Sequence, residues 1–198
     1  MFLSPTGFIF VHNPKVAGTT IRLQLQEQIP QGVTMKGYEH IAGRIRDVAH
    51  IPLFILKEAN PTIFEAIAFN GFVLVRNPYT RAVSSFIHSI RQHRTVNQPY
   101  PYENLGEFLR NAPQSEDPNL AHAQPQHWFV CDDGQQHVAS VFKLEDVAGA
   151  TMLLPGAKID LSKQENDQEI LSYTLDETTK KLVQEVYAKD FELLGFDP

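Results

Sequence analysis

The chain has 198 residues, of which 42% are hydrophobic, so it is long enough to bury the core of one globular domain. Its formal net charge of −6 argues against the broad basic surface that nucleic-acid binding needs, and we expect no nucleic-acid partner. The single cysteine, Cys131, excludes an internal disulfide and is expected to be a buried thiol, compatible with a reducing compartment.

The N-terminal segment predicts a strand, a tight loop and a helix. A strand is predicted at residues 8–12, because the unbroken apolar run at residues 8–11 is typical of a strand buried on both faces of a parallel sheet. A helix is expected from Gly18 or Thr19 to about Ile29, because apolar residues recur every four positions and Pro30 follows.

The next stretch predicts a second helix, which begins after His40 and is broken by Pro52. Its apolar stripe would consist of Ile41, Ile45 and Val48.

A short helical segment is expected at residues 64–69, followed by a strand at residues 72–75. Asn77 is then a good N-cap and Pro78 a good first helical residue, so a long helix is predicted over residues 78–94.

The C-terminal half begins with a segment rich in Pro, Asn and Gln at about residues 96–135, with a helical turn at residues 105–110. We interpret it as a loop-rich insertion over the sheet of a single domain that spans residues 1–198. A strand is predicted at residues 138–144 and a last helix at residues 176–190.

A first anion-binding signature follows the first predicted strand and reads HNPKVAGTT. Gly18 lets the backbone approach a phosphate, and N–H groups from Ala17 to Thr20 can point at its oxygens. Lys15 supplies a positive charge, and the hydroxyls of Thr19 and Thr20 can donate hydrogen bonds. The alternative is an ordinary strand-to-helix turn with a solvated lysine.

A second signature follows the strand at residues 72–75 and reads RNPYTRAVSS. Arg76 ends the strand, so its guanidinium can form a fork onto a phosphate. Ser84 lies about two helical turns into the following helix and can share that phosphate if the helix runs alongside it. Arg81 is expected to pair with a carboxylate elsewhere in the fold. The alternative for Arg76 is that it braces a loop.

These two signatures resemble the 5′-phosphosulfate loop and the 3′-phosphate motif of sulfotransferases of the carbohydrate type, the sulfotransferase-2-like family. Three further segments are similar to the pattern of that family, namely EHIAGR, FKLED and YAKDFELLGF. We therefore expect an α/β, three-layer P-loop-like domain with a short central parallel sheet flanked by helices.

The resemblance implies that 3′-phosphoadenosine 5′-phosphosulfate (PAPS) is the donor and adenosine 3′,5′-bisphosphate the product. By resemblance, the 3′-phosphate would be held by Arg76 and Ser84. Lys15 would also act in catalysis, near the oxygen that gains charge as the sulfuryl group leaves. The residues assigned to the 5′ side are Lys15, Ala17, Gly18, Thr19 and Thr20.

The reaction would be an in-line attack on sulfur by a hydroxyl or amine of a small-molecule or glycan acceptor. His40 is our candidate for the base, because the predicted helix N-terminus would keep its imidazole neutral. A capping or buried structural histidine is the alternative, and Glu39 is the substitute base. His12 is expected to form a wall of the donor pocket.

No metal requirement is predicted, since no Mg²⁺ motif is evident, and His122 and His127 are interpreted as loop surface rather than zinc ligands. No apolar run approaches the roughly 20 residues of a membrane span, so a cytoplasmic protein is expected. A P-loop kinase or NTPase and a non-catalytic nucleotide-binding module remain alternative functions. The sequence does not set the oligomeric state.

Overall fold

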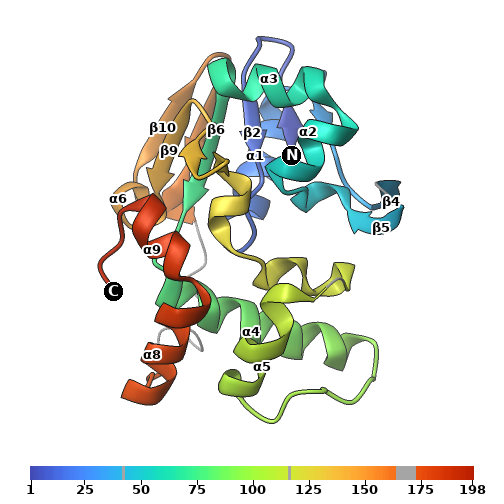
Figure 1. The fold of residues 1–198 in the computed structure, drawn as a ribbon. Coiled ribbons are helices and arrows are strands. Elements are labelled where there is room, and N and C mark those ends of the chain that lie inside the picture. The colour runs from blue at the N-terminus through green and yellow to red at the C-terminus, as the bar shows by residue number, and fades with distance from the viewer. Residues whose placement is uncertain (42, 116, 164–172) are drawn as a thin grey trace.

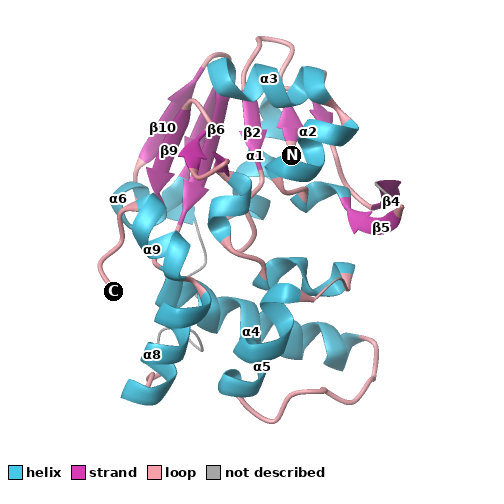
Figure 2. Ribbon diagram, viewed as in Figure 1, coloured by secondary structure: helices cyan, strands magenta, loops and turns pink. Residues whose placement is uncertain are grey.

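The computed structural model describes residues 1–41, 43–115, 117–163 and 173–198 and shows a mixed α/β fold (Figures 1 and 2). Its main sheet has five strands in the order β3-β1-β2-β6-β9. Strand β6 is parallel to both of its neighbours, β2 and β9, whereas β1 is antiparallel to both β2 and β3. The bounds are β1 Phe2–Leu3, β2 Ile9–Val11, β3 Val33–Thr34, β6 Gly71–Val75 and β9 Ser140–Lys143.

The expectation of a parallel sheet is therefore only partly right. The three strands predicted from apolar runs are the parallel ones, and they are central to the sheet or, for β9, at its edge. The prediction missed β1, which a tight turn joins directly to β2. In that turn Ser4 N–H donates to Phe8 O over 2.9 Å, and Gly7 has a φ of +102°. So short a connection can only give antiparallel pairing.

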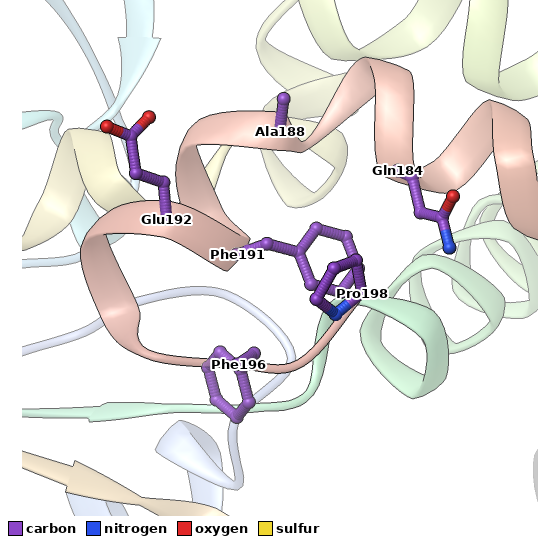
Figure 3. Close-up of a pocket in the computed structure, with 6 residues that line it drawn as sticks. All are labelled: Gln184, Ala188, Phe191, Glu192, Phe196 and Pro198. Atoms are coloured by element: carbon purple, nitrogen blue, oxygen red, sulfur yellow. The ribbon is translucent and has the colours of Figure 1, made fainter.

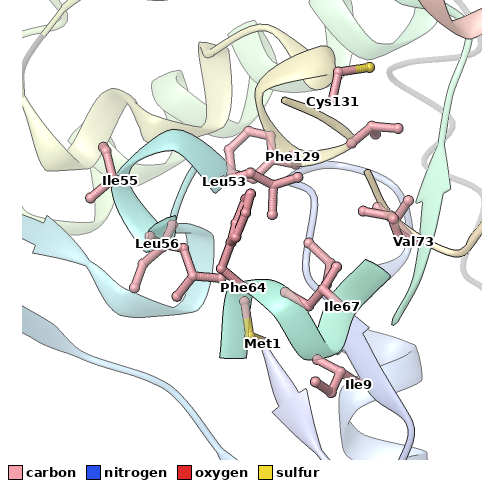
Figure 4. Close-up of a cluster of buried hydrophobic side chains, with 14 of the residues drawn as sticks. Met1, Ile9, Leu53, Ile55, Leu56, Phe64, Ile67, Val73, Phe129 and Cys131 are labelled. Atoms are coloured by element: carbon pink, nitrogen blue, oxygen red, sulfur yellow. The ribbon is translucent and has the colours of Figure 1, made fainter. Parts of the chain in front are cut away.

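Alternate residues of the central strands pack into different clusters, which places helices on both faces of the sheet. Ile9 and Val73 belong to a cluster that includes α2 (Leu53–Ala59) and α3 (Pro61–Asn70), part of which Figure 4 shows. Phe10 and Phe72 pack instead with residues of α1 (Gly18–Gln28) and of the hairpin formed by β10 (Thr151–Leu154) and β11 (Ala157–Asp160). This two-residue alternation is the physical basis of the layered arrangement.

Helix α1 (Gly18–Gln28) confirms the first predicted helix. Its buried residues Ile21 and Leu25 are those of the expected apolar stripe. Helix α4 (Pro78–Thr95) confirms the long helix, and the Asn77 side chain accepts a hydrogen bond from Tyr79 N–H at its start.

The helix expected after His40 is wrong. This region forms a hairpin of β4 (Tyr38–Ile41) and β5 (Arg44–Asp47), with Gly43 at a φ of +76°. This left-handed conformation is strained for a residue with a Cβ but not for glycine, so Gly43 favours a turn at this point. The β-branched residues Ile41 and Ile45 favour strands on either side of it. Pro52 precedes a helix, α2, rather than ending one.

The C-terminal half contains more short elements than predicted. The last helix is divided at Tyr187 into α8 (Glu177–Val186) and α9 (Ala188–Leu194), and the antiparallel pair β10 (Thr151–Leu154) and β11 (Ala157–Asp160) was not anticipated. No helix among the described residues is long and apolar enough to cross a membrane. The remaining elements are 3₁₀ helices η1 (Val48–His50), η2 (Ala112–Gln114), η3 (Pro118–Ala123), η4 (Gln126–Phe129) and η5 (Leu161–Lys163), helices α5 (Leu105–Asn111) and α6 (Leu144–Val147), and strands β7 (Cys131–Asp132) and β8 (Gln135–Gln136).

Candidate active site

The two anion-binding signatures lie side by side because β2 and β6 are adjacent parallel strands. Val11 is in register with Val73, so both strands end at the same edge of the sheet. The buried Asn13 side chain in the first loop donates from Nδ2 to Leu74 O over 2.9 Å, which ties that loop to β6. Ligands of open α/β sheets bind at this carboxyl edge.

The first loop exposes the start of α1. Lys15 and Ala17 have φ values of +65° and +63°, a left-handed conformation that is costly for residues with a Cβ. Ala17 is the N-cap, and no described side chain caps the first turn of the helix. A Cβ on Gly18 would lie 2.0 Å from the His12 ring, so only glycine fits there. The backbone is thus shaped to offer uncapped N–H groups to an anion.

The second loop is organised differently, because the start of α4 is already capped by Asn77. Arg76 is half-buried at the end of β6, and its Nε donates to Thr80 Oγ1 over 3.1 Å. This contact orients the guanidinium from within the same loop. Ser84 is on the buried face of α4, with 3% of its area exposed. A phosphate could contact its hydroxyl only by entering the space between α4 and the residues packed against it.

The Arg81 side chain forms hydrogen bonds with the backbone of two loops. It is buried, with Nε donating to Pro14 O over 3.2 Å and Nη2 donating to Gln124 O over 2.7 Å. These hydrogen bonds go to carbonyl oxygens of two loops, and the carboxylate near Arg81 is that of Asp190, whose charge acts on the guanidinium without a salt bridge to it among the described residues. Burial lowers the pKa of Arg81, and nearby Tyr187 and Asp190 partly offset that effect.

Four imidazoles gather behind the first loop and are called here the histidine cluster: His12, His50, His88 and His122. The ring centroids are 4.3 Å apart for His12 and His50, 4.8 Å for His50 and His122, and 4.3 Å for His88 and His122. His50 Nδ1 donates to His12 O over 2.9 Å, which fixes its tautomer and leaves Nε2 unprotonated in the neutral ring. Among the described residues, three buried ring nitrogens have no hydrogen-bond partner, namely His12 Nδ1, His88 Nε2 and His122 Nδ1.

Burial keeps this cluster neutral. It lowers the pKa of His50 to about 3 and that of His88 to about 4, and it places the pKa values of His12 and His122 well below the usual range. The positive charge of Lys15 contributes to the lowering of the pKa at His50, His88 and His122. A neutral imidazole keeps a lone pair that can accept a proton, but burial and a nearby cation both make it a weaker base than a solvated ring.

His40 is not part of this cluster. It is exposed on β4, opposite Ile45 of β5, and there is no helix N-terminus to keep its ring neutral. Sequence reasoning missed His50 and His88 and interpreted His122 as loop surface. One signal was present, because Ser84 and His88 are four residues apart and share a face of the predicted helix.

Several other polar residues of the 96–135 segment take structural roles. His127 Nδ1 pairs with Asp190 Oδ1 at 2.7 Å, and Asp132 Oδ2 pairs with Lys57 Nζ at 2.6 Å. Cys131 is buried, which raises the pKa of its thiol. Within the described part of the chain, no group of three or more His, Cys, Asp or Glu side chains is arranged to hold a metal ion.

A cavity of about 330 Å³ lies elsewhere, on α8, α9 and the C-terminal residues. None of the predicted site residues lines it, so the anion-binding loops and not this cavity are the candidate site. Figure 3 shows its six lining residues, which are Gln184, Ala188, Phe191, Glu192, Phe196 and Pro198.

The comparison with protein-family models gives a match to the Sulfotransferase family over residues 6–197, nearly the whole chain. No curated protein and no solved structure gives a match. The match covers both anion-binding loops, the histidine cluster and the C-terminal helices. The chain therefore belongs to the Sulfotransferase family, which makes it a transferase of sulfuryl groups.

Proposed function

We propose that this protein transfers a sulfuryl group from PAPS to a hydroxyl or amine of a carbohydrate-like acceptor. The observation that carries the proposal is the pair of cationic loops on adjacent parallel strands, one with an uncapped helix start and one with an arginine at the strand end. A donor with phosphate groups on its 5′ and 3′ sides has two anions for two such loops. The carbohydrate-like acceptor rests on the resemblance of these loops to the carbohydrate type.

The residues of the first loop suit the 5′ side of the donor. The backbone N–H groups at Ala17, Gly18, Thr19 and Thr20 would hold the phosphosulfate, with the two threonine hydroxyls as further donors. Lys15 would stabilise the charge that forms on the leaving oxygen. Fixed cations of this kind are typically worth a few kcal/mol in the transition state.

The residues of the second loop suit the 3′-phosphate. The Arg76 guanidinium presents paired donors that match phosphate oxygens, and its contact with Thr80 limits the number of conformations it must give up on binding. Ser84 would add its hydroxyl to the same phosphate from within α4.

For the base we propose the pair His88–His122 in place of His40. As whole residues His88 and His122 are half-buried, each with one buried ring nitrogen, whereas His12 and His50 are only 6% and 8% exposed, so the pair is the more accessible part of the cluster. In the proposed step the acceptor oxygen or nitrogen bonds to sulfur while the bond from sulfur to the bridging oxygen breaks. The acceptor proton passes to the imidazole, and no metal takes part.

Calorimetric titration with adenosine 3′,5′-bisphosphate tests this proposal, with ADP and Mg-ATP as controls. We expect micromolar binding of the bisphosphate and much weaker binding of ADP, because ADP cannot place a phosphate on Arg76. Preference for Mg-ATP would contradict the proposal in favour of a kinase. The absence of binding by all three would indicate a module that has lost its nucleotide site.

A further inference from the structure

A single buried side chain joins the two anion-binding loops. The Gln126 carboxamide donates from Nε2 to Arg76 O over 2.7 Å and accepts at Oε1 from Arg76 N–H over 2.9 Å. The same oxygen accepts from Asn13 Nδ2 over 3.2 Å. Gln126 and Asn13 are both 0% exposed. One amide therefore contacts the backbone of the second loop and a side chain of the first.

The position of Gln126 is itself fixed from the C-terminal helices. The carboxylate of Asp190, fully buried in α9, accepts from Gln126 N–H over 2.8 Å and from His127 N–H over 2.9 Å. These bonds satisfy backbone donors at the start of η4, which its own N-cap residue, Pro125, does not cap with a side chain. Because Asp190 is held by a helix, Gln126 approaches the loops from a rigid support.

Arg81 provides a second link between the first loop and the segment that contains Gln126. It joins Pro14 of the first loop to Gln124, two residues before Gln126 in the chain. Tyr187 also donates from its hydroxyl to Ala123 O over 2.8 Å. Residues 122–127, called here the clasp, are therefore bonded to the first loop, to the second loop and to the C-terminal helices.

We infer that Gln126 is a positioning residue that sets the spacing between the 5′ and 3′ phosphate sites. Its carboxamide carries a donor and an acceptor in one plane, which matches the N–H and C=O of Arg76 as a neighbouring strand would. Leucine has the volume but neither group, and glutamate lacks the donor. The inference rests on the proposed function, since it presumes a ligand with both phosphates.

Spacing matters because the second phosphate of a ligand gains binding energy only when its site lies where the first contact puts it. If the loops drift apart, each loop can still bind an anion, but one ligand can no longer satisfy both. Loss of the Gln126 side chain should therefore reduce the gain in affinity that the 3′-phosphate provides. It should not weaken the binding of all nucleotides equally.

The experiment measures Kd by calorimetry for adenosine 3′,5′-bisphosphate and for adenosine 5′-monophosphate. The ratio of the two Kd values reports the benefit of the 3′-phosphate. In Gln126→Leu we expect this ratio to fall about tenfold, as neighbouring members of one hydrogen-bond network are usually coupled. Gln124→Leu is the matched control, because it lies in the same clasp while its buried Oε1 bonds to no described residue. Its ratio should stay at the wild-type value.

Gln126→Glu is the second variant, which keeps the acceptor for Arg76 N–H and Asn13 but turns an oxygen towards Arg76 O. It should give an intermediate ratio and carries the test if Gln126→Leu does not fold. A merely structural role would lower the melting temperature and leave the ratio unchanged, and that outcome in a folded variant would overturn the inference. A wild-type protein that does not prefer the bisphosphate would instead overturn the proposed function.

Discussion

The two anion-binding loops share a plan of strand, loop and helix but use different chemistry. In the first, the helix start has no side-chain cap, and two residues with a Cβ adopt left-handed conformations, Lys15 and Ala17. In the second, Asn77 caps the helix, and Arg76 provides the charge. Similar local sequences therefore leave backbone N–H groups uncapped at one strand end and place a guanidinium beside a capped helix at the next.

The two loops also differ in backbone strain. A residue other than glycine at positive φ costs of order 1–3 kcal/mol and persists only when the surroundings impose it. Here the ring of His12 packs against Gly18, and Arg81 donates a hydrogen bond to Pro14 O. These two buried contacts hold the backbone of the first loop in its strained conformation. The second loop carries no residue with positive φ among its described positions. Of the two loops, only the one that we place at the reacting group therefore carries this strain.

The largest effect that separates the loops is expected for Lys15→Ala. The ammonium would act on charge that forms in the transition state, so kcat should fall about 100- to 1000-fold while the Kd for the bisphosphate changes little. The measurement is release of adenosine 3′,5′-bisphosphate from PAPS in the presence of a glycan panel, together with calorimetric Kd. A loss of affinity as large as the loss of turnover would remove the catalytic role of Lys15.

The histidine cluster gives the next largest effect. His88→Ala or His122→Ala should lower kcat about 100-fold, the usual contribution of a positioned base, whereas the control His40→Ala should leave it within about twofold. Since the pKa of His88 is lowered to about 4, the ring is deprotonated above that value, and kcat/KM should not decline near pH 6.5 as acid is added but only as pH approaches 4. A decline that sets in well above pH 4 would contradict the assignment of His88 as the base.

The contrast between His40 and the cluster shows what the sequence can and cannot predict. Strands β2, β6 and β9 and helices α1 and α4 follow from local apolar patterns and capping residues, and so do the loops between them. The histidine cluster does not follow from local sequence patterns, because its four members come from distant segments of the chain. Only the packing of α4 and η3 behind the first loop brings them together, and no local pattern encodes that packing.

A smaller effect is expected at the second loop. Arg76→Ala should weaken bisphosphate binding about 10- to 100-fold, because a charged hydrogen-bonding group is lost, and kcat at saturating PAPS should stay close to the wild-type value. Arg76→Lys should recover only part of the affinity, since an ammonium cannot form the bidentate contact. Adenosine 5′-monophosphate is the control ligand and should bind all three proteins alike. Equal weakening of both nucleotides would show that Arg76 braces the loop rather than binding the 3′-phosphate.

The smallest effects concern the helix starts themselves. Ala17→Gly should raise the free energy of unfolding by about 1 kcal/mol, because glycine adopts positive φ without strain, and Asn77→Ala should lower it by about 1 kcal/mol through loss of the cap. Urea denaturation measures both changes. Asn77→Ala also frees Tyr79 N–H at the start of α4. If the second loop depends on Arg76 alone, bisphosphate affinity in this variant stays within about twofold of wild type, whereas tighter binding would mean that the freed N–H group takes up phosphate as the start of α1 is proposed to do.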